Sequence, residues 1–375
     1  MNEREITEIR RRFRPDKENI AFVRGCYVND KHEIISEYNQ SLALLNVEET
    51  EEILGTVKKT LSGSLTKNLI PVQFSTKQVT DGEEHALLMK LRDSALADDE
   101  AVKKFYEKAI SAINIEGSYM IMLVYDAYDV PSYSKDGEKD GESSSVFRYI
   151  LCSVCPIKAT KPALSFYLHE NRFRSLTADY VVSPPEYGFM FPSFDRRQTN
   201  IYEALYYTRS TKESCAPFAA AVLASELPMP ASSQKETFGA VLGDSIGDDM
   251  SYTMIEAVHS QLCEMIEEHK ASRDPEPLVV DRGTVSGVLA SCGASDEKVA
   301  AFGEKFDAEF GAGAELSPKN IVTPTKFEVS TPDVSVKVNP ERRDLIETRV
   351  IDGTKYILIR ADGGVEVNGV SIAIS

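Results

Sequence analysis

Apolar positions in the first third of the chain recur at two spacings, one typical of helices and one typical of strands. Ile6, Ile9 and Phe13 follow one another at three- and four-residue intervals, which places them on one face of a helix. Residues 20–28 instead form a short apolar run before a polar turn, the pattern of a β-hairpin. The predicted elements are a helix capped by Asn2 and ended by Pro15, a hairpin over 20–28 and 33–39, a helix from Asn46 to residue 61, and two helices within 83–113.

The centre of the chain carries a continuous apolar run. Residues 119–128 begin without polar interruption, which indicates a strand buried on both faces of a sheet. The connections between the strands that follow are too short for crossover helices, so neighbouring strands must be antiparallel. The sequence therefore predicts a central antiparallel sheet. Its later strands are expected at 149–157, 164–169, 180–182, 187–191 and 201–207.

The following segment is acidic and helical. Residues 213–309 contain 18 acidic and 6 basic residues, a net charge of −12, and lack β-branched runs. Helices are expected after Ser251 and on both sides of Gly293, over about 283–292 and 296–310. The last two could form a helix-turn-helix, but an acidic second helix would repel phosphates, so we favour an αα-hairpin for packing or partner binding.

After Pro324 the pattern is strictly that of strands. Turn residues that tolerate positive φ separate them, for example Asp352-Gly353 and Asn368-Gly369, and they predict tight hairpins. The fold class is therefore α+β. The expected domains are a mixed α+β domain over 1–210 with an N-terminal hairpin, helices and the central antiparallel sheet, an acidic helical region over 211–311, and a C-terminal antiparallel β-hairpin unit over 312–375.

Composition places the chain among ordinary globular proteins. It has 375 residues, 42% hydrophobic and 27% charged, and a net charge of −17, which disfavours bulk nucleic-acid binding unless basic side chains gather on one surface. The charged first residues, the lack of an apolar run of membrane-spanning length and six cysteines, widely spaced apart from one pair, predict a cytoplasmic protein with reduced thiols and no membrane partner. Walker and Rossmann glycine patterns are absent, so no cofactor is expected.

Two pairs of residues are candidates for metal chemistry. Cys152 and Cys155 have the spacing of a zinc or redox pair, but residues three apart on a strand point to opposite faces, and we favour buried structural thiols. Asp126 and Asp129, at the end of a central strand, could act as paired carboxylates or hold magnesium. A third ligand at defined spacing is missing, so strand-end turn chemistry is the favoured interpretation.

Arginines beside aromatic residues mark the candidate binding positions. Arginine next to exposed rings can hold single-stranded nucleic acid, although charged strand edges that prevent aggregation explain the same pattern. Further bases occur in the first helix and in the C-terminal unit, so they are concentrated towards both ends of the chain. The candidate binding residues are Arg172, Arg174, Arg196, Arg197, Arg342 and Arg343.

Several segments together resemble a bacterial family described as domain of unknown function 4317, typical of Firmicutes. They are RGCYV (24–28), KTLSGSLTKNL (59–69), LRDSALADDE (91–100), DAYDVP (126–131), YILCSVCPIK (149–158), GFMFPSF (188–194), ALYYT (204–208) and VNPERRDLIETRVIDGTKYILI (338–359). That family implies no activity and no residue roles. The order of segments is also similar to nucleoid-associated proteins of Gram-negative bacteria, through LRD (91–93) and the C-terminal hairpins, which implies association with the nucleoid through DNA-handling partners.

Two hypotheses follow. The first is a non-enzymatic cytosolic binding or scaffold protein, for which the second resemblance implies association with the nucleoid. Its basic side chains from both ends of the chain would lie on one surface and the acidic helices on another. Protein partners are expected, and nucleic acid is disfavoured by the net charge. The alternative is a metal-dependent enzyme whose site lies near Asp126, Asp129, Cys152 and Cys155. We favour the first.

Overall fold

A computed structural model describes residues 1–133, 139–160, 163–176, 180–272, 274, 276–325, 327–361, 363–367 and 370–372. The chain forms two compact units. Unit 1 contains Met1–Ser233 and Pro275–Pro277, and unit 2 contains Gln234–Asp274 and Leu278–Ser375. Each unit has its own hydrophobic core.

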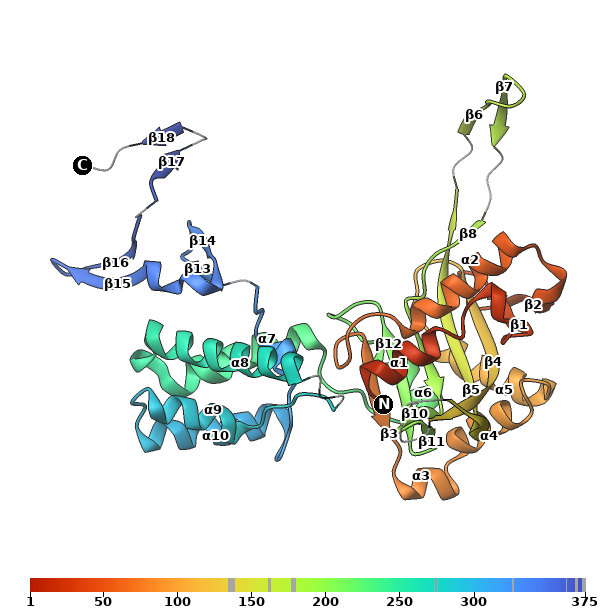
Figure 1. Ribbon diagram of the computed structural model, residues 1–375, viewed down its shortest axis with the longest axis horizontal. Coiled ribbons are helices and arrows are strands. Elements are labelled where there is room, and N and C mark those ends of the chain that lie inside the picture. Colours follow the sequence, from red (N-terminus) through yellow and green to blue (C-terminus); the bar gives the residue numbers. More distant parts are fainter. Residues whose placement is uncertain are drawn as a thin grey trace. The chain divides into compact units, whose positions relative to one another are not determined.

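Unit 1 is built on an antiparallel sheet (Figure 1). The strands follow the order β2-β1-β4-β5-β9-β12-β3, and β8 pairs with β5. The paired segments are β1 (Phe22–Val28), β2 (Ile34–Ser41), β3 (Leu69–Gln73), β4 (Tyr119–Tyr133), β5 (Lys139–Ala159), β8 (Tyr180–Val182), β9 (Tyr187–Phe191) and β12 (Glu203–Thr208). Two further ribbons lie outside this sheet, β6 (Ala163–Tyr167) with β7 (Arg172–Leu176) and β10 (Ser193–Asp195) with β11 (Gln198–Asn200).

Helices cover both faces of the sheet, which explains why its central strands are apolar throughout. Ile121 and Leu123 of β4 belong to one core cluster, and Met122 and Val124 belong to the other. The first cluster includes α4 (Glu83–Asp93), α5 (Asp99–Ala112) and α6 (Ala216–Leu223), with the short α3 (Thr76–Asp81) beside α4. The second includes α1 (Glu3–Arg10) and α2 (Val47–Lys58), which continues into a 3₁₀ turn over Lys59–Leu61.

Unit 2 is a group of helices followed by separate hairpins. The helices pack around Val258, Leu262, Leu289, Phe302 and Phe306. They are α7 (Ala231–Ile246), α8 (Tyr252–Ser272), α9 (Arg282–Ser291), α10 (Asp296–Phe310) and α11 (Pro318–Ile321). The strands pair as β13 (Phe327–Ser330) with β14 (Ser335–Val338), β15 (Ile346–Ile351) with β16 (Thr354–Ile359), and β17 (Val365–Val367) with β18 (Val370–Ile372).

The α+β class is confirmed, and most expected elements occur near their expected positions. Asn2 and Asn46 form the capping boxes of α1 and α2. Some elements were not expected individually, namely β3, β7, β10, β11, α3, α6, α7 and α11. Helix α6 lies within the segment assigned from sequence to the acidic helical region, yet Phe218 and Leu223 are buried in the core of unit 1.

Candidate functional site

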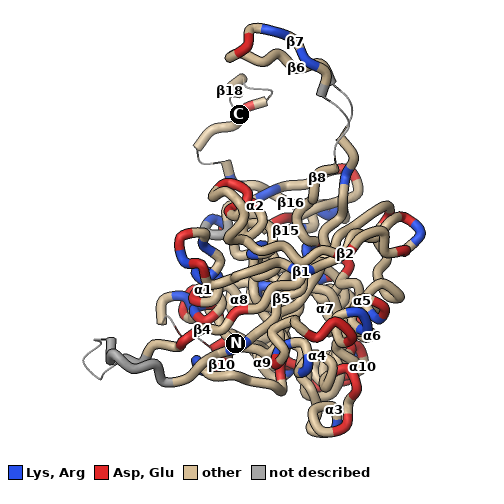
Figure 2. Tube along the Cα trace, turned by 90° about the vertical axis from the view of Figure 1, so that its right-hand side faces the viewer, with Lys and Arg blue, Asp and Glu red and all other residues tan. Residues whose placement is uncertain are grey.

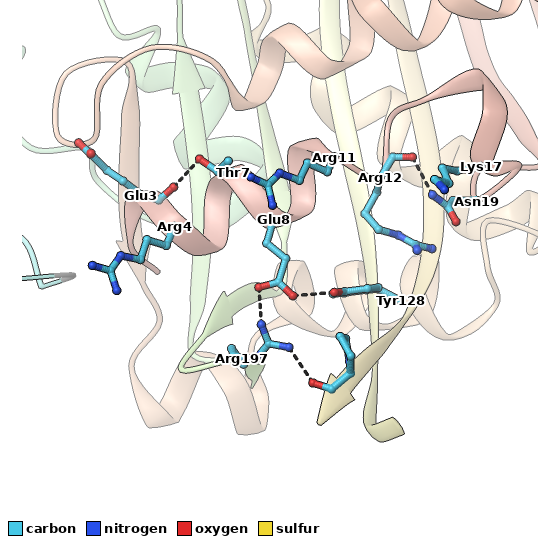
Figure 3. A pocket seen from close by; sticks show the side chains of 11 residues that line it. Glu3, Arg4, Thr7, Glu8, Arg11, Arg12, Lys17, Asn19, Tyr128 and Arg197 are labelled. Atoms are coloured by element: carbon cyan, nitrogen blue, oxygen red, sulfur yellow. Dashed lines mark hydrogen bonds and ion pairs between the residues drawn. The ribbon is translucent and has the colours of Figure 1, made fainter. Parts of the chain in front are cut away.

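The candidate site is an open cleft of about 720 Å³ beside α1 (Figure 3). This volume lies within the range of ligand sites. Five basic and two acidic side chains line it, a local excess of positive charge in a chain whose net charge is −17. The lining residues are Glu3, Arg4, Thr7, Glu8, Arg11, Arg12, Lys17, Asn19, Tyr128, Pro131 and Arg197.

The amphipathic pattern of α1 explains why its charged side chains face the cleft. Ile6 and Ile9 are buried in the core of unit 1 and fix one side of the helix against the sheet. Arg4, Glu8 and Arg11 recur at three- and four-residue intervals, so they share another side. The helix therefore presents a charged row to solvent while its apolar stripe holds it in place.

A buried carboxylate orients Arg12. Asp126, which is 1% exposed, accepts hydrogen bonds from Arg12 Nε and Nη2, each 2.9 Å long. The hydroxyl of Tyr149 donates to the same carboxylate at 3.0 Å. Burial opposes the charge of Arg12, but the hydrogen bond and the attraction of Asp126 outweigh it, and the pKa of Arg12 is raised. Its guanidinium also lies 4.7 Å from the ring centre of Tyr128, a cation–π contact.

A second arginine enters the cleft from a turn far along the chain. Figure 3 shows Glu8 between Arg197 and Tyr128. Arg197 Nη1 donates to Glu8 Oε2 at 2.6 Å, and the Tyr128 hydroxyl donates to Glu8 Oε1 at 2.6 Å. Arg197 Nη2 donates to the carbonyl of Pro131 at 2.9 Å. Arg12 and Arg197 are thus held on either side of Tyr128 by fixed partners.

The turn that carries Arg197 has an unusual backbone. Arg196 and Arg197, between β10 and β11, have φ values of 49° and 58°. Two consecutive positive φ values suit Asn-Gly, and residues with long side chains adopt them at a cost of order 1 kcal/mol each. The buried carboxylate of Glu5 accepts a hydrogen bond from the backbone N–H of Arg197 at 3.0 Å, which helps to hold this conformation.

The structure distributes the six candidate arginines over three places. Arg197 lines the cleft, and Arg196 is exposed beside it. Arg172 and Arg174 lie on β7 and both pair with Glu170. Arg342 and Arg343 belong to unit 2, where Arg342 pairs with Asp344 at 3.1 Å and Arg343 Nη1 donates to the hydroxyl of Ser260.

Sequence reasoning missed the cleft itself. The bases of the first helix were noted, but nothing in the sequence connected them with Arg197 or Tyr128. The sequence pattern that could have indicated the cleft is the run Arg10-Arg11-Arg12-Phe13-Arg14, in which four basic residues surround one apolar residue.

The metal-site candidates do not converge. Cys152 and Cys155 belong to the two different core clusters, as expected for opposite faces of a strand. Asp126 is committed to Arg12 and Tyr149, whereas Asp129 is exposed three residues further along the strand. Within the described ranges, no group of three His, Cys, Asp or Glu side chains is placed to hold a metal ion.

Cys152 and Cys155 should resist an aromatic disulfide reagent in native protein at pH 8. Burial raises the pKa of Cys155 to about 12 and raises the pKa of Cys152 well above its ordinary value, so neither forms the reactive thiolate. In denatured protein all six thiols should react with the reagent. In native protein at most three should react, those of Cys215, Cys263 and Cys292. Mass spectrometry showing rapid native modification at Cys152 or Cys155 would contradict this burial.

Comparison with known proteins identifies a family and assigns no chemistry. The family model described as Domain of unknown function (DUF4317) matches residues 1–370. No curated protein and no solved structure matches the chain. Among the helices of the described part of the chain, none combines the length and apolar character needed to cross a membrane.

Proposed function

We propose a function for this chain, which belongs to the DUF4317 family, from its own geometry. It is a non-enzymatic binding protein of the bacterial cytoplasm that holds nucleic-acid phosphates in the α1 cleft and so associates with the nucleoid. Its other surfaces serve as a scaffold for protein partners. The observation that carries the proposal is the convergence of five basic side chains on one cleft of an acidic chain.

Two features of the cleft support a polyanionic partner. Arg12 and Arg197 are oriented before any ligand arrives, by Asp126 and by Glu8 respectively, so binding costs little side-chain entropy. Arg4, Arg11 and Lys17 are exposed along the rim, where they can approach successive phosphates. Lys and Arg that neutralise phosphates release condensed counterions, which favours binding at low salt.

The acidity of the rest of the chain shapes this interaction. A net charge of −17 repels a polyanion at distances beyond the cleft, whereas salt screens that repulsion over about 10 Å at 0.1 M. Binding is therefore local and confined to the basic surface. The alternative of a metal-dependent enzyme lacks comparable support, because Cys152 and Cys155 face different cores and Asp126 is already paired.

Neutralising the rim of the cleft should weaken binding of a short DNA duplex. In the triple variant Arg4→Gln, Arg11→Gln and Lys17→Gln, three phosphate contacts are lost. The slope of log affinity against log salt should then become shallower by about 2.7, at about 0.9 per contact. Fluorescence anisotropy of a labelled duplex across a salt series measures both affinity and slope.

The matched control removes the same charge elsewhere in unit 1. Lys77, Lys103 and Lys104 are exposed on α3 and α5, outside the cleft. For the variant in which all three are changed to Gln, the slope of log affinity against log salt should equal that of the wild-type protein within error. Equal weakening by both triple variants would show a general charge effect, and a wild-type protein that binds no duplex at low salt would refute the proposal.

A further inference from the structure

The β6–β7 ribbon of unit 1 exposes more apolar surface than a hairpin in water normally does. Leu164 is 73% exposed, Leu168 82% and Phe173 67%, and Phe166 is 45% exposed. Such a concentration of large apolar side chains marks an interaction surface in soluble proteins. An isolated two-stranded hairpin is also marginally stable in water, so a partner that covers this ribbon would stabilise it.

The register of the ribbon separates apolar and charged residues onto two faces. Phe166 pairs with Phe173, and their rings meet edge to face with centres 5.0 Å apart. Leu164, two residues before Phe166, lies on this same face. Tyr167 pairs with Arg172, and the guanidinium of Arg174 lies 5.0 Å from the ring centre of Tyr167 on the opposite face. We call the first the apolar ribbon face, defined by Leu164, Phe166 and Phe173.

The placement of charge decides which partner fits the apolar ribbon face. Figure 2 shows basic positions along β7 and an acidic position at the end of the ribbon. Arg172 and Arg174 both pair with Glu170 and lie on the face opposite the phenylalanines. Among the described side chains of the ribbon, no lysine or arginine lies on the apolar face, so a nucleic acid or an anionic bilayer seated there would lack a basic partner. A second apolar surface is the complementary partner.

A second copy of the chain supplies that surface by symmetry. Two apolar ribbon faces stacked about a two-fold axis bury the rings against each other, as two sheets do at about 10 Å separation. Arg172 and Arg174 of both copies then remain outside, in solvent, without like-charge contact across the interface. No charged side chain of β6 or β7 is buried by this arrangement.

The area is close to what a reversible dimer requires. Tyr180 and Val182, which share one face of β8, are exposed as well, so six large apolar side chains are available on this part of unit 1. If each buries on the order of 100 Å², two copies bury about 1,200 Å² in total, the lower end of the range for specific interfaces.

We propose that the apolar ribbon face is a self-association surface through which two copies of this chain form a dimer. This proposal is independent of the nucleic-acid function of the cleft. It assigns Leu164, Phe166 and Phe173 as contact residues and leaves Arg172 and Arg174 on the solvent side.

Light scattering coupled to size-exclusion chromatography tests the proposal on the full chain. The wild-type protein at tens of micromolar should have twice the mass of one chain. The double variant Phe166→Ser and Phe173→Ser should elute as a monomer, with a dissociation constant raised at least about tenfold, because central aromatic residues dominate interface energies. Its far-ultraviolet circular dichroism spectrum should match that of the wild type, since neither ring belongs to a core cluster of unit 1.

The matched control changes the opposite face of the same strands. Arg172→Gln and Arg174→Gln together should leave the dimer intact. A monomeric wild-type protein, or a dimer that survives both phenylalanine substitutions, would overturn the proposal. It would also be overturned if those substitutions abolished binding to anionic vesicles or to duplex DNA without changing the mass.

Discussion

Replacing Asp126 with Ala should lower the free energy of unfolding by about 3–5 kcal/mol, the usual cost of leaving a buried charge without its partner. Asp126 accepts two hydrogen bonds from Arg12 and one from Tyr149. Without the carboxylate, the guanidinium of Arg12, whose side chain is 20% exposed, keeps its charge in a largely desolvated position. The buried hydroxyl of Tyr149 also loses its acceptor, which adds to the cost. Urea unfolding followed by far-ultraviolet circular dichroism measures the loss.

The same substitution at Asp129 is the control. Asp129 lies three residues further along β4 and is exposed, so Asp129→Ala should change the free energy of unfolding by no more than about 0.5 kcal/mol. If the two variants lost similar free energies of unfolding, the buried ion pair between Asp126 and Arg12 would make no specific contribution to stability. The double variant Asp126→Ala, Arg12→Leu should regain much of the lost free energy of unfolding, because it also removes the unpaired charge of Arg12.

Local pattern was sufficient to predict most elements of this fold. Residues 119–124 indicate a strand buried on both faces because no position in the run is charged, and β4 contributes to both core clusters. The cap residue Asn2 and the capping box at Asn46 located the first turns of α1 and α2, since the hydrogen bonds of a cap are local. Strand β3 was missed because five residues that include Pro71 give little pattern. Its place at the sheet edge beside β12 depends on pairs that are 130 or more positions apart.

The candidate site was harder to predict for the same reason. Arg12 and Asp126 are 114 residues apart, and nothing local to either residue indicates the other. The turn at Arg196 and Arg197 lacks the Asn-Gly chemistry that indicates a tight hairpin, so no local pattern places Arg197 beside α1. The opposite orientation of Cys152 and Cys155 was predictable, because it follows from the two-residue period of a single strand.

Dimerisation through the apolar ribbon face would change how the cleft acts. A dimer carries two α1 clefts, and a nucleic acid long enough to reach both would bind the second at a high effective concentration. A short duplex should therefore bind alike to the wild-type protein and to the Phe166→Ser, Phe173→Ser variant. A long duplex should bind more tightly to the wild-type protein than to this variant. The comparison therefore separates the contribution of the cleft to affinity from that of the ribbon.

Replacing Gly188 with Ala should destabilise unit 1 by about 3 kcal/mol, at the upper end of the cost of overpacking. Gly188 lies in β9, a fully buried central strand. A Cβ atom there would come within 2.1 Å of the carbonyl oxygen of Cys152 in β5 and 2.9 Å of Thr60 Cγ2. Strand β5 is packed on both faces, so its backbone cannot move aside without disturbing both cores.

Gly55→Ala, the same change in a different environment, should raise the free energy of unfolding instead of lowering it. Gly55 lies inside α2, and a Cβ added there would have no neighbouring atom within 4 Å, so alanine gains helix propensity of about 0.5–1 kcal/mol without a clash. The free energies of unfolding of the two variants should therefore differ by about 3.5–4 kcal/mol in urea, although each adds one methyl group. Equal stability of the Gly188→Ala variant and the wild type would contradict the close approach of β5 and β9 on which the sheet order depends.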